Sequence, residues 1–291
     1  MLDMTVAVAG LLVGFVVGLT GMGGGALMTP VLVLLFGVPP LTAVSSDLVA
    51  SMIMKPVGGA VHWKRGTVHR PLVFWLMLGS VPSAFIGVAL LKYLGSEQAL
   101  QGIVKHALGV ALLVVVFGLV VRPLLQRKRQ QEGEDEAPLQ VRPIPTLLIG
   151  IFGGLVVGMT SVGSGSLMIV LLLMLYPRIR LSELVGTDLV QAVPLVSSAA
   201  LGHLLFGDFK FGLTASILVG SLPGVFLGAL FSSRAKDHVI RPVLIVVLLA
   251  SAMKLLGAGT VLVGCTAAVV TLFAVLYGYS ASQRMARQSA S

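Results

Sequence analysis

Charged residues are scarce in this sequence. Of its 291 residues, 11% are Asp, Glu, Lys or Arg and 56% are hydrophobic, whereas a typical soluble domain carries about a quarter charged residues. This scarcity excludes an ordinary soluble fold, because a chain of this length has too little interior to bury so much apolar surface. Several apolar stretches approach the roughly 18 to 20 residues that cross a bilayer as a helix: 71–91, 103–121, 185–205, 211–231 and 258–280. The sequence therefore predicts an all-α, polytopic membrane protein.

Cysteine is almost missing as well, because Cys265 stands alone in the chain. A single cysteine excludes an internal disulfide and any metal site built from a cysteine pair. The HExxH zinc motif and a nucleophile–base arrangement are also missing, so we expect no enzyme, no metal site and no cofactor. Acidic residues are few, and the formal net charge is +9. The basic residues lie in short loops between apolar segments, which predicts contact with the lipid bilayer and not with nucleic acid.

What the sequence does contain is two copies of one unit. Residues 14–28, GFVVGLTGMGGGALM, align with residues 154–168, GLVVGMTSVGSGSLM. After one inserted residue the match continues, and its paired positions include Ser46 with Thr187, Asp47 with Asp188, His62 with His203, and Pro82 with Pro223. So long a match indicates an internal duplication in which one fold is used twice.

The duplication defines the expected boundaries. Transmembrane repeat 1 covers residues 1–121, and transmembrane repeat 2 covers residues 145–256. Residues 122–144 between them are basic, then acidic, with a proline near each end, and this composition predicts a solvent-exposed linker in the cytoplasm. Residues 257–291 have no counterpart in repeat 1, so we expect an additional C-terminal transmembrane helix and a short tail there.

Glycine-rich stretches, TGMGGG and TSVGSG, interrupt the first apolar segment of each repeat. Such a broken segment either crosses the bilayer as a kinked helix or re-enters it as a hairpin. The positive-inside rule favours hairpins, because Lys and Arg then gather on one side, whereas kinked spans divide them almost equally. Each repeat then crosses an odd number of times, so the repeats are inverted, as in secondary transporters. The N-terminus is expected in the periplasm and the C-terminus in the cytoplasm.

The two glycine-rich tips are the candidate substrate site. Irregular backbone at membrane depth is tolerated where it is buried in protein or lines a cavity. Unpaired amides at the start of a short helix, with glycine allowing close approach, suit a compact oxyanion. The alternative is that the glycines only permit close helix packing. The candidate residues are Thr20, Gly21, Gly23, Gly24, Gly25, Thr160, Ser161, Gly163, Ser164, Gly165 and Ser166.

Lys55 is the sharpest single candidate. It falls about midway along an apolar helix expected over 48–62, where a charge is costly and usually functional. Its paired position in repeat 2 is Val196, so Lys55 is not part of the shared scaffold. We interpret Lys55 as a positive contribution to the anion site, and the alternatives are a structural ion pair or a snorkelling side chain.

Two pairs of ionisable residues are candidates for coupling or gating. Asp47 and Asp188 stand where their helices are expected to begin, so helix N-capping is one explanation and proton coupling the other. His62 and His203 follow some 15 residues later, roughly 22 Å along a helix. We therefore expect both histidines near the opposite membrane interface, with gating or proton relay as the alternative role.

The segments SSDLVASMIMKPVGGAVHWKRGTV and VGTDLVQAVPLVSSAALGHLLFGDFKF, together with the paired glycine-rich stretches, resemble the sulfite exporter TauE/SafE family. The broader grouping of this family includes sulfonate permeases. The resemblance runs from about residue 8 to residue 256 and recurs in both halves. It implies a permease of the bacterial inner membrane for sulfite, organosulfonates or related sulfur-containing anions.

We therefore expect a secondary transporter that moves a small sulfur-containing anion by alternating access between the two inverted units. A passive anion channel that uses the same pathway is one alternative, and a membrane scaffold without transport is another. The sequence leaves open whether the chain forms a homo-oligomer.

Overall fold

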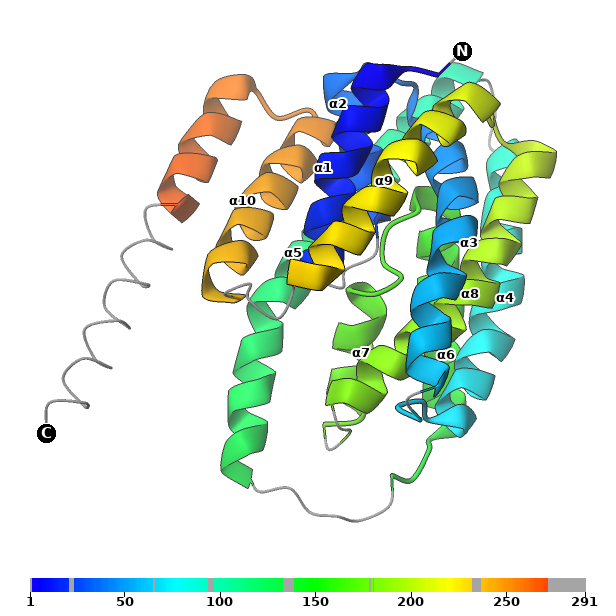
Figure 1. Cartoon of the computed structure of the whole chain (residues 1–291), viewed down its shortest axis with the longest axis vertical. Helices are drawn as coiled ribbons and strands as arrows, with labels where there is room; N and C mark the ends of the chain where they lie inside the picture. Colours follow the sequence, from blue (N-terminus) through cyan, green and yellow to red (C-terminus); the bar gives the residue numbers. More distant parts are fainter. Residues whose placement is uncertain are drawn as a thin grey trace, which may run out of the picture.

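The computed structural model describes residues 2–20, 24–64, 66–93, 97–132, 139–177, 179, 181–231 and 237–271, and all regular secondary structure in these ranges is α-helical (Figure 1). The helices are α1 (Met4–Thr20), α2 (Gly25–Leu35), α3 (Pro40–Lys64), α4 (Arg70–Tyr93), α5 (Glu97–Glu132), α6 (Pro143–Thr160), α7 (Leu167–Leu175), α8 (Leu181–Phe206), α9 (Phe211–Phe231) and α10 (Asp237–Leu255). A further apolar helix spans Thr260–Thr271, inside the expected C-terminal extension.

Stretches of α4, α5, α6, α8 and α9 are long and apolar enough to cross a bilayer. Many large apolar side chains on these helices are exposed in the isolated chain, among them Phe74, Phe117 and Phe226. Exposed apolar surface of this extent suits lipid and not water. The expectation of an all-α, multi-pass membrane protein is confirmed.

Helix α5 is longer than the apolar stretch from which it was expected. It continues to Glu132, so the start of the linker assigned to residues 122–144 falls inside the helix. The continuation reads RPLLQRKRQQE, and apart from Pro123 its residues, Leu, Gln, Arg, Lys and Glu, are all strong helix formers. Polarity therefore ends the apolar span of α5 without ending the helix.

The closest helix pairs join one half of the chain to the other. Helix α1 packs along α9, and α6 packs along α4. A Cβ atom at Gly14 of α1 would lie 2.6 Å from the Ser221 carbonyl oxygen, and one at Gly154 of α6 would lie 2.4 Å from that of Ser80. Both distances are too short for any side chain, so glycine lets the backbones touch. Because Gly14 pairs with Gly154 and Ser80 with Ser221, one interface is built twice.

Both interfaces are parallel. Along α1 and α9 the contacts advance together, from Ala7 against Gly220 to Phe15 against Gly228. Figure 1 shows α1 starting at the end of the molecule that carries the N-terminus, whereas α6 starts at the opposite end, after the segment that follows α5. The equivalent first helices of the two halves thus run in opposite directions through the molecule.

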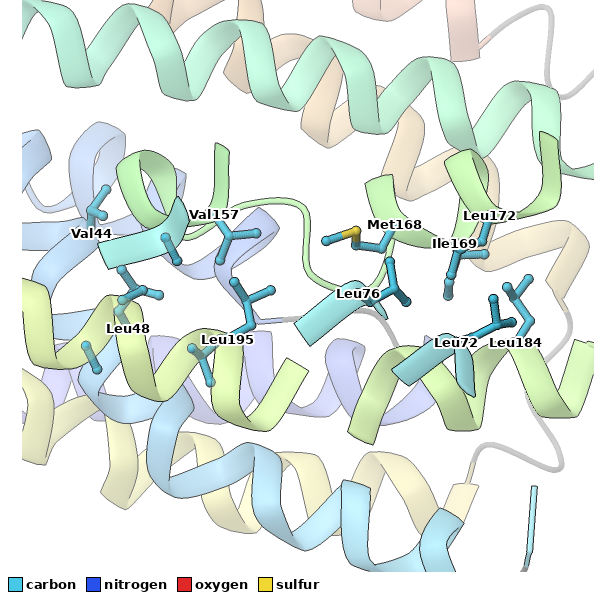
Figure 2. Close-up of a cluster of buried hydrophobic side chains, with 14 of the residues drawn as sticks. Val44, Leu48, Leu72, Leu76, Val157, Met168, Ile169, Leu172, Leu184 and Leu195 are labelled. Carbon is cyan, nitrogen blue, oxygen red and sulfur yellow. The ribbon is translucent and has the colours of Figure 1, made fainter. Parts of the chain in front are cut away.

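A shared apolar core holds the two halves together. Figure 2 shows part of it, with Leu76 of α4 beside Met168 of α7 and Leu72 of α4 beside Leu184 of α8. These four side chains are fully buried. Because α4 belongs to the first half and α7 and α8 to the second, residues from both halves are held in fixed relation around the middle of the molecule.

Candidate functional site

The second glycine-rich tip is a tight reversal between α6 and α7. Ser161 ends α6 in the left-handed region, with φ 60°, and its N–H donates to the Val157 carbonyl oxygen at 2.8 Å. Gly163 and Gly165 both have φ +117°, a conformation that only glycine adopts readily. The backbone path therefore requires glycine at positions 163 and 165. The hydroxyls of Ser161 and Ser164 lie in the same reversal and are available for contacts with other helices.

The two tips meet. A Cβ atom on Gly25, the first residue of α2, would lie 2.0 Å from the Ser161 carbonyl oxygen and 2.7 Å from the Ser161 Oγ. Next to it, Gly24 has open space, with no atom within 4 Å of an added Cβ. Gly21 and Gly23 of the first tip lie outside the described residues. Two candidate segments far apart in the sequence are thus in direct contact.

Asp47 of α3 lies against this junction. Its carboxylate is 3% exposed. The Ser161 hydroxyl donates to Asp47 Oδ2 at 2.6 Å, and the Thr29 hydroxyl of α2 donates to the same oxygen at 3.1 Å. Asp47 therefore links α2, α3 and the second tip, and charge-assisted bonds of this kind are among the stronger ones in proteins.

The interpretation of Asp47 and Asp188 as helix N-caps is wrong. Helix α3 begins at Pro40 and α8 at Leu181, so both aspartates lie about two turns inside their helices. Interior backbone N–H groups are already bonded within the helix, which leaves a side chain there nothing to cap. The carboxylates are instead bonded to other side chains.

Thr29 is a site residue that the sequence reasoning missed. It is completely buried, and its hydroxyl reaches Asp47. Its paired position in the second half is Ile169. The sequence did contain a signal for Thr29. It is the one hydroxyl in the apolar segment of α2, and the paired residue of the second half is aliphatic.

Lys55 faces the same tip from further along α3. It lies eight residues after Asp47, about 12 Å along the helix axis. Its ammonium group donates to the Ser164 hydroxyl, and it interacts electrostatically with both Asp188 and Asp47. The side chain is partly buried. The structure thus brings Lys55 to the second glycine-rich tip.

Asp188 of α8 sits in a different environment from its partner Asp47. It is 1% exposed, and the Gln191 side-chain amide donates to its Oδ1 at 3.3 Å. The Ser80 hydroxyl of α4 in turn donates to Gln191 Oε1 at 3.3 Å. The Gln191 amide beside Asp188 has its place taken at Asp47 by the hydroxyls of Thr29 and Ser161.

His203, which was expected near a membrane interface, lies inside the protein. It is completely buried: its Nε2 lies 2.8 Å from the Gly158 carbonyl oxygen, and its Nδ1 lies 2.8 Å from Ser45 Oγ. Tertiary packing of α8 against α3 and α6, which periodicity does not reveal, encloses the ring. Its counterpart His62 is partly exposed, with Nδ1 3.0 Å from the Thr67 hydroxyl.

Thr20 and Thr160, at the ends of α1 and α6, each bond a carbonyl oxygen of their own helix. The Thr20 hydroxyl donates to the Val16 carbonyl oxygen at 2.8 Å, and the Thr160 hydroxyl donates to that of Val156 at 2.6 Å. Ser166 precedes α7 without a side-chain capping bond. The hydroxyls of Ser161 and Ser164 reach α3, at Asp47 and Lys55.

A second pair of contacts repeats across the two halves. The Lys210 N–H, at the start of α9, donates to Ser46 Oγ at 3.5 Å, and the His69 N–H, at the start of α4, donates to Thr187 Oγ1 at 2.9 Å. Ser46 pairs with Thr187, and His69 pairs with Lys210. Each half thus anchors the loop of the other half on its own long helix.

Residues 6–255 match the family described as "Sulfite exporter TauE/SafE". The chain belongs to the TauE/SafE sulfite exporter family. Members of this family are membrane transporters, and the match covers both halves of the chain and every residue of the site described above.

Curated relatives agree with the family match. "Probable membrane transporter protein YjnA" of Bacillus subtilis (strain 168) is 38% identical over 256 residues, which are 88% of this chain and 100% of the relative. "Probable membrane transporter protein YdhB" of the same strain is 24% identical over 79% of this chain and 90% of the relative. A "Probable membrane transporter protein" of Xylella fastidiosa (strain Temecula1 / ATCC 700964) is 26% identical over 84% of this chain and 91% of the relative. No solved structure matches the chain.

Proposed function

We propose that this TauE/SafE protein is a secondary transporter that moves a small sulfur-containing anion, such as sulfite or a sulfonate, across the bacterial inner membrane. The family match supports the substrate class. The observation that carries the proposal is Lys55, a partly buried ammonium group in a membrane-spanning bundle, which meets the glycine-rich second tip at Ser164. Lys55 has no charged counterpart in the second half, and burying its charge costs free energy. A buried charge of this kind indicates a functional role, and a positive charge suits an anion.

We infer that the repeats are inverted and that each begins with a re-entrant hairpin. In support, α1 and α6 start at opposite ends of the molecule in Figure 1, and each is followed by a short helix, α2 or α7. At about 1.5 Å per residue, 11 residues in α2 and 9 in α7 span only about half of the roughly 30 Å hydrocarbon core. This topology puts the N-terminus in the periplasm and the C-terminus in the cytoplasm.

The substrate would bind where the tips meet. Helices α2 and α7 both begin there, and their first N–H groups and positive dipole ends favour an oxyanion. Lys55 supplies a full positive charge, and the Ser164 hydroxyl supplies a donor once the anion takes its place beside the ammonium group. The open space at Gly24 leaves the first tip accessible at close range.

Alternating access follows from the way in which the halves are joined. The α1–α9 and α4–α6 interfaces are glycine-lined and tight, so each pair moves as one body. We propose that these bodies rock about the junction of the tips and expose it to one side of the membrane at a time.

Counterflow of radiolabelled sulfite in proteoliposomes tests the proposal. Vesicles loaded with unlabelled sulfite should take up label transiently and saturably, which a carrier does and a channel does not. Lys55→Met should lower the counterflow rate about 10- to 100-fold, the effect of losing a charged hydrogen-bond donor. Lys55→Arg should keep part of it, because the charge remains while the shape changes.

Lys254→Met is the matched control. Lys254 lies at the end of α10, where its ammonium group donates to Thr260 Oγ1 at 2.9 Å in an exposed position. Equal loss in both Met variants would show that Lys55 has no special role. Flux without counterflow would indicate a channel, and no flux across sulfite and several sulfonates, with folded protein, would refute transport of this substrate class.

A further inference from the structure

The charges at the junction of the tips do not balance for an anion alone. Asp47 and Asp188 are 3% and 1% exposed, and the Lys55 ammonium group interacts electrostatically with both. With all three groups ionised, these side chains carry one net negative charge before any substrate binds. A bound monovalent anion doubles that negative charge in a poorly solvated place, which is strongly unfavourable. One proton arriving with the anion restores the charge of the empty site.

Two further charged residues lie beside the start of α3: Asp208, which accepts from the Thr42 hydroxyl, and Lys210, whose N–H donates to Ser46, and their opposite charges leave this count unchanged. Helices α2 and α9, which pack against α3, carry no ionisable side chain. From α8, the groups besides Asp188 are Glu183 and His203, and His203 is bonded to Ser45 and Gly158. On α5 the nearest cationic candidates, Lys105 and His106, lie toward its start, where His106 bonds the Gly102 carbonyl oxygen in an exposed position.

The partners of Asp47 suit a group that gains and loses a proton. Both are hydroxyls, those of Thr29 and Ser161. A hydroxyl donates to a carboxylate and can turn to accept from a carboxylic acid, so Asp47 stays hydrogen-bonded in either state. Asp188 accepts a hydrogen bond from the amide nitrogen of Gln191, which only donates and whose own oxygen accepts from Ser80. This one bond suits the ionised form of Asp188, whereas both hydroxyl bonds of Asp47 suit either form.

Asp47 is also the group whose charge holds the tips. Thr29 belongs to the first hairpin and Ser161 to the second, and both bonds end on the same oxygen, Oδ2. Bonds to a carboxylate are about twice as strong as bonds between neutral groups. Neutralising Asp47 therefore weakens the attachment of both tips at once, where the anion would bind.

We propose that Asp47 binds a proton that travels with the anion, so that transport is an electroneutral cotransport of one monovalent anion and one proton. The proton enters from the water on the side to which the site is open, resides on the Asp47 carboxylate while the anion lies beside Lys55, and leaves to the other side with it. This inference rests on the proposed anion transport and adds its coupling ion.

Proteoliposomes with the membrane potential clamped at zero by potassium and valinomycin test the coupling. Labelled sulfite and labelled methanesulfonate serve as probes, since methanesulfonate stays a monovalent anion and cannot leak as its acid. With the outside one pH unit more acidic, one proton per anion should drive accumulation of about tenfold, and a trapped pH dye should report acidification. Protein-free vesicles subtract leakage, and a potassium diffusion potential should leave accumulation unchanged.

Three variants locate the proton. Asp47→Asn should lose accumulation driven by the pH gradient to a much greater extent than it loses counterflow, because a permanently neutral group cannot carry protons. Asp47→Glu should keep a response to the gradient. Asp188→Asn, the matched change in the other half, should respond to the gradient even where its overall flux is lower.

The outcomes separate this inference from the proposed function. Counterflow in the wild type that ignores the pH gradient and follows the membrane potential overturns the cotransport and leaves anion transport standing. Full gradient-driven accumulation in Asp47→Asn overturns the role of Asp47. No counterflow of either probe in the wild type overturns both proposals. The dye measurement needs only the wild type, so it decides the coupling even if a variant fails to fold.

Discussion

Replacing Gly25 with alanine tests whether the two glycine-rich tips touch. The added Cβ atom would lie 2.0 Å from the Ser161 carbonyl oxygen, whereas ordinary van der Waals contact begins at 3.4 Å. One tip must therefore retreat by about 1 Å or more, and overpacking of this kind typically costs about 1–3 kcal/mol. The added Cβ atom is fixed to the backbone and the Ser161 carbonyl oxygen is part of it, so no flexible side chain can absorb the shift.

The same displacement reaches Asp47. The Ser161 hydroxyl is 2.6 Å from Asp47 Oδ2, and a retreat of about 1 Å takes it beyond hydrogen-bonding distance. Losing a hydrogen bond to a charged group costs about 1.5–3 kcal/mol. Gly25→Ala should therefore destabilise the protein by about 2.5–6 kcal/mol, and it should also reduce transport, because the lining of the site moves.

Thermal unfolding in detergent measures the effect, with Gly24→Ala as the neighbouring control. Gly24 has φ −56° and ψ −35°, which alanine adopts freely, and no atom lies within 4 Å of its Cβ position. Gly24→Ala should therefore unfold at the wild-type temperature or slightly above it. If Gly25→Ala also unfolds at the wild-type temperature, the tips do not meet as described and the proposed site loses its geometry.

Two further predictions concern the ends of the helices. Thr187→Val leaves the His69 N–H without its acceptor and should destabilise the protein by about 1–2 kcal/mol. Ser46→Ala should cost less, because the Lys210 N–H lies 3.5 Å from Ser46 Oγ and the bond that is lost is weaker. Equal costs of the two variants in thermal unfolding would contradict this ranking. Asp3 precedes α1, and hydrogen bonds from the Thr5 hydroxyl and the Val6 N–H lower the pKa of its carboxyl group from 3.8. A lowered pKa in the folded state stabilises the fold above the ordinary pKa of aspartate, and this contribution is lost as the pH falls through the folded-state value. Asp3→Asn should therefore lower the unfolding temperature at pH 7 and match the wild type in strong acid, and a difference that persists in acid would rule out this linkage.

The hydropathy pattern and the internal repeat predicted the general architecture from the sequence. The apolar stretches predicted a multi-pass helical membrane protein, and the resemblance to TauE/SafE predicted the family, and both are confirmed. The repeat predicted that each glycine-rich stretch precedes a short helix, and α2 and α7 stand at those places. These features depend on hydropathy and on self-similarity, which are properties of the sequence itself.

Features that depend on contacts between helices were not readable in this way. Apolarity suggested helices starting near Asp47 and Asp188, but α3 and α8 begin at Pro40 and Leu181. In α3 the polar residues of the first two turns, Thr42, Ser45 and Ser46, are buried against the other half. Burial of His203 depends on α3 and α6, which lie far from it in the sequence. The role of Thr29 depends likewise on a partner in another helix.

The parallel interface between α1 and α9 also has a consequence for biosynthesis. The glycines of α1 meet backbone that is made about 200 residues later, and at roughly 5–20 residues per second the ribosome needs about 10–40 s to supply it. Helix α6, by contrast, finds α4 already synthesised when it emerges. The N-terminal helix must therefore wait in the membrane with a bare glycine surface, and a chain truncated before Phe211 leaves that surface without its natural partner. In a nascent chain that stalls during this interval, the uncovered glycine surface of α1 is a defect that quality-control proteins can recognise.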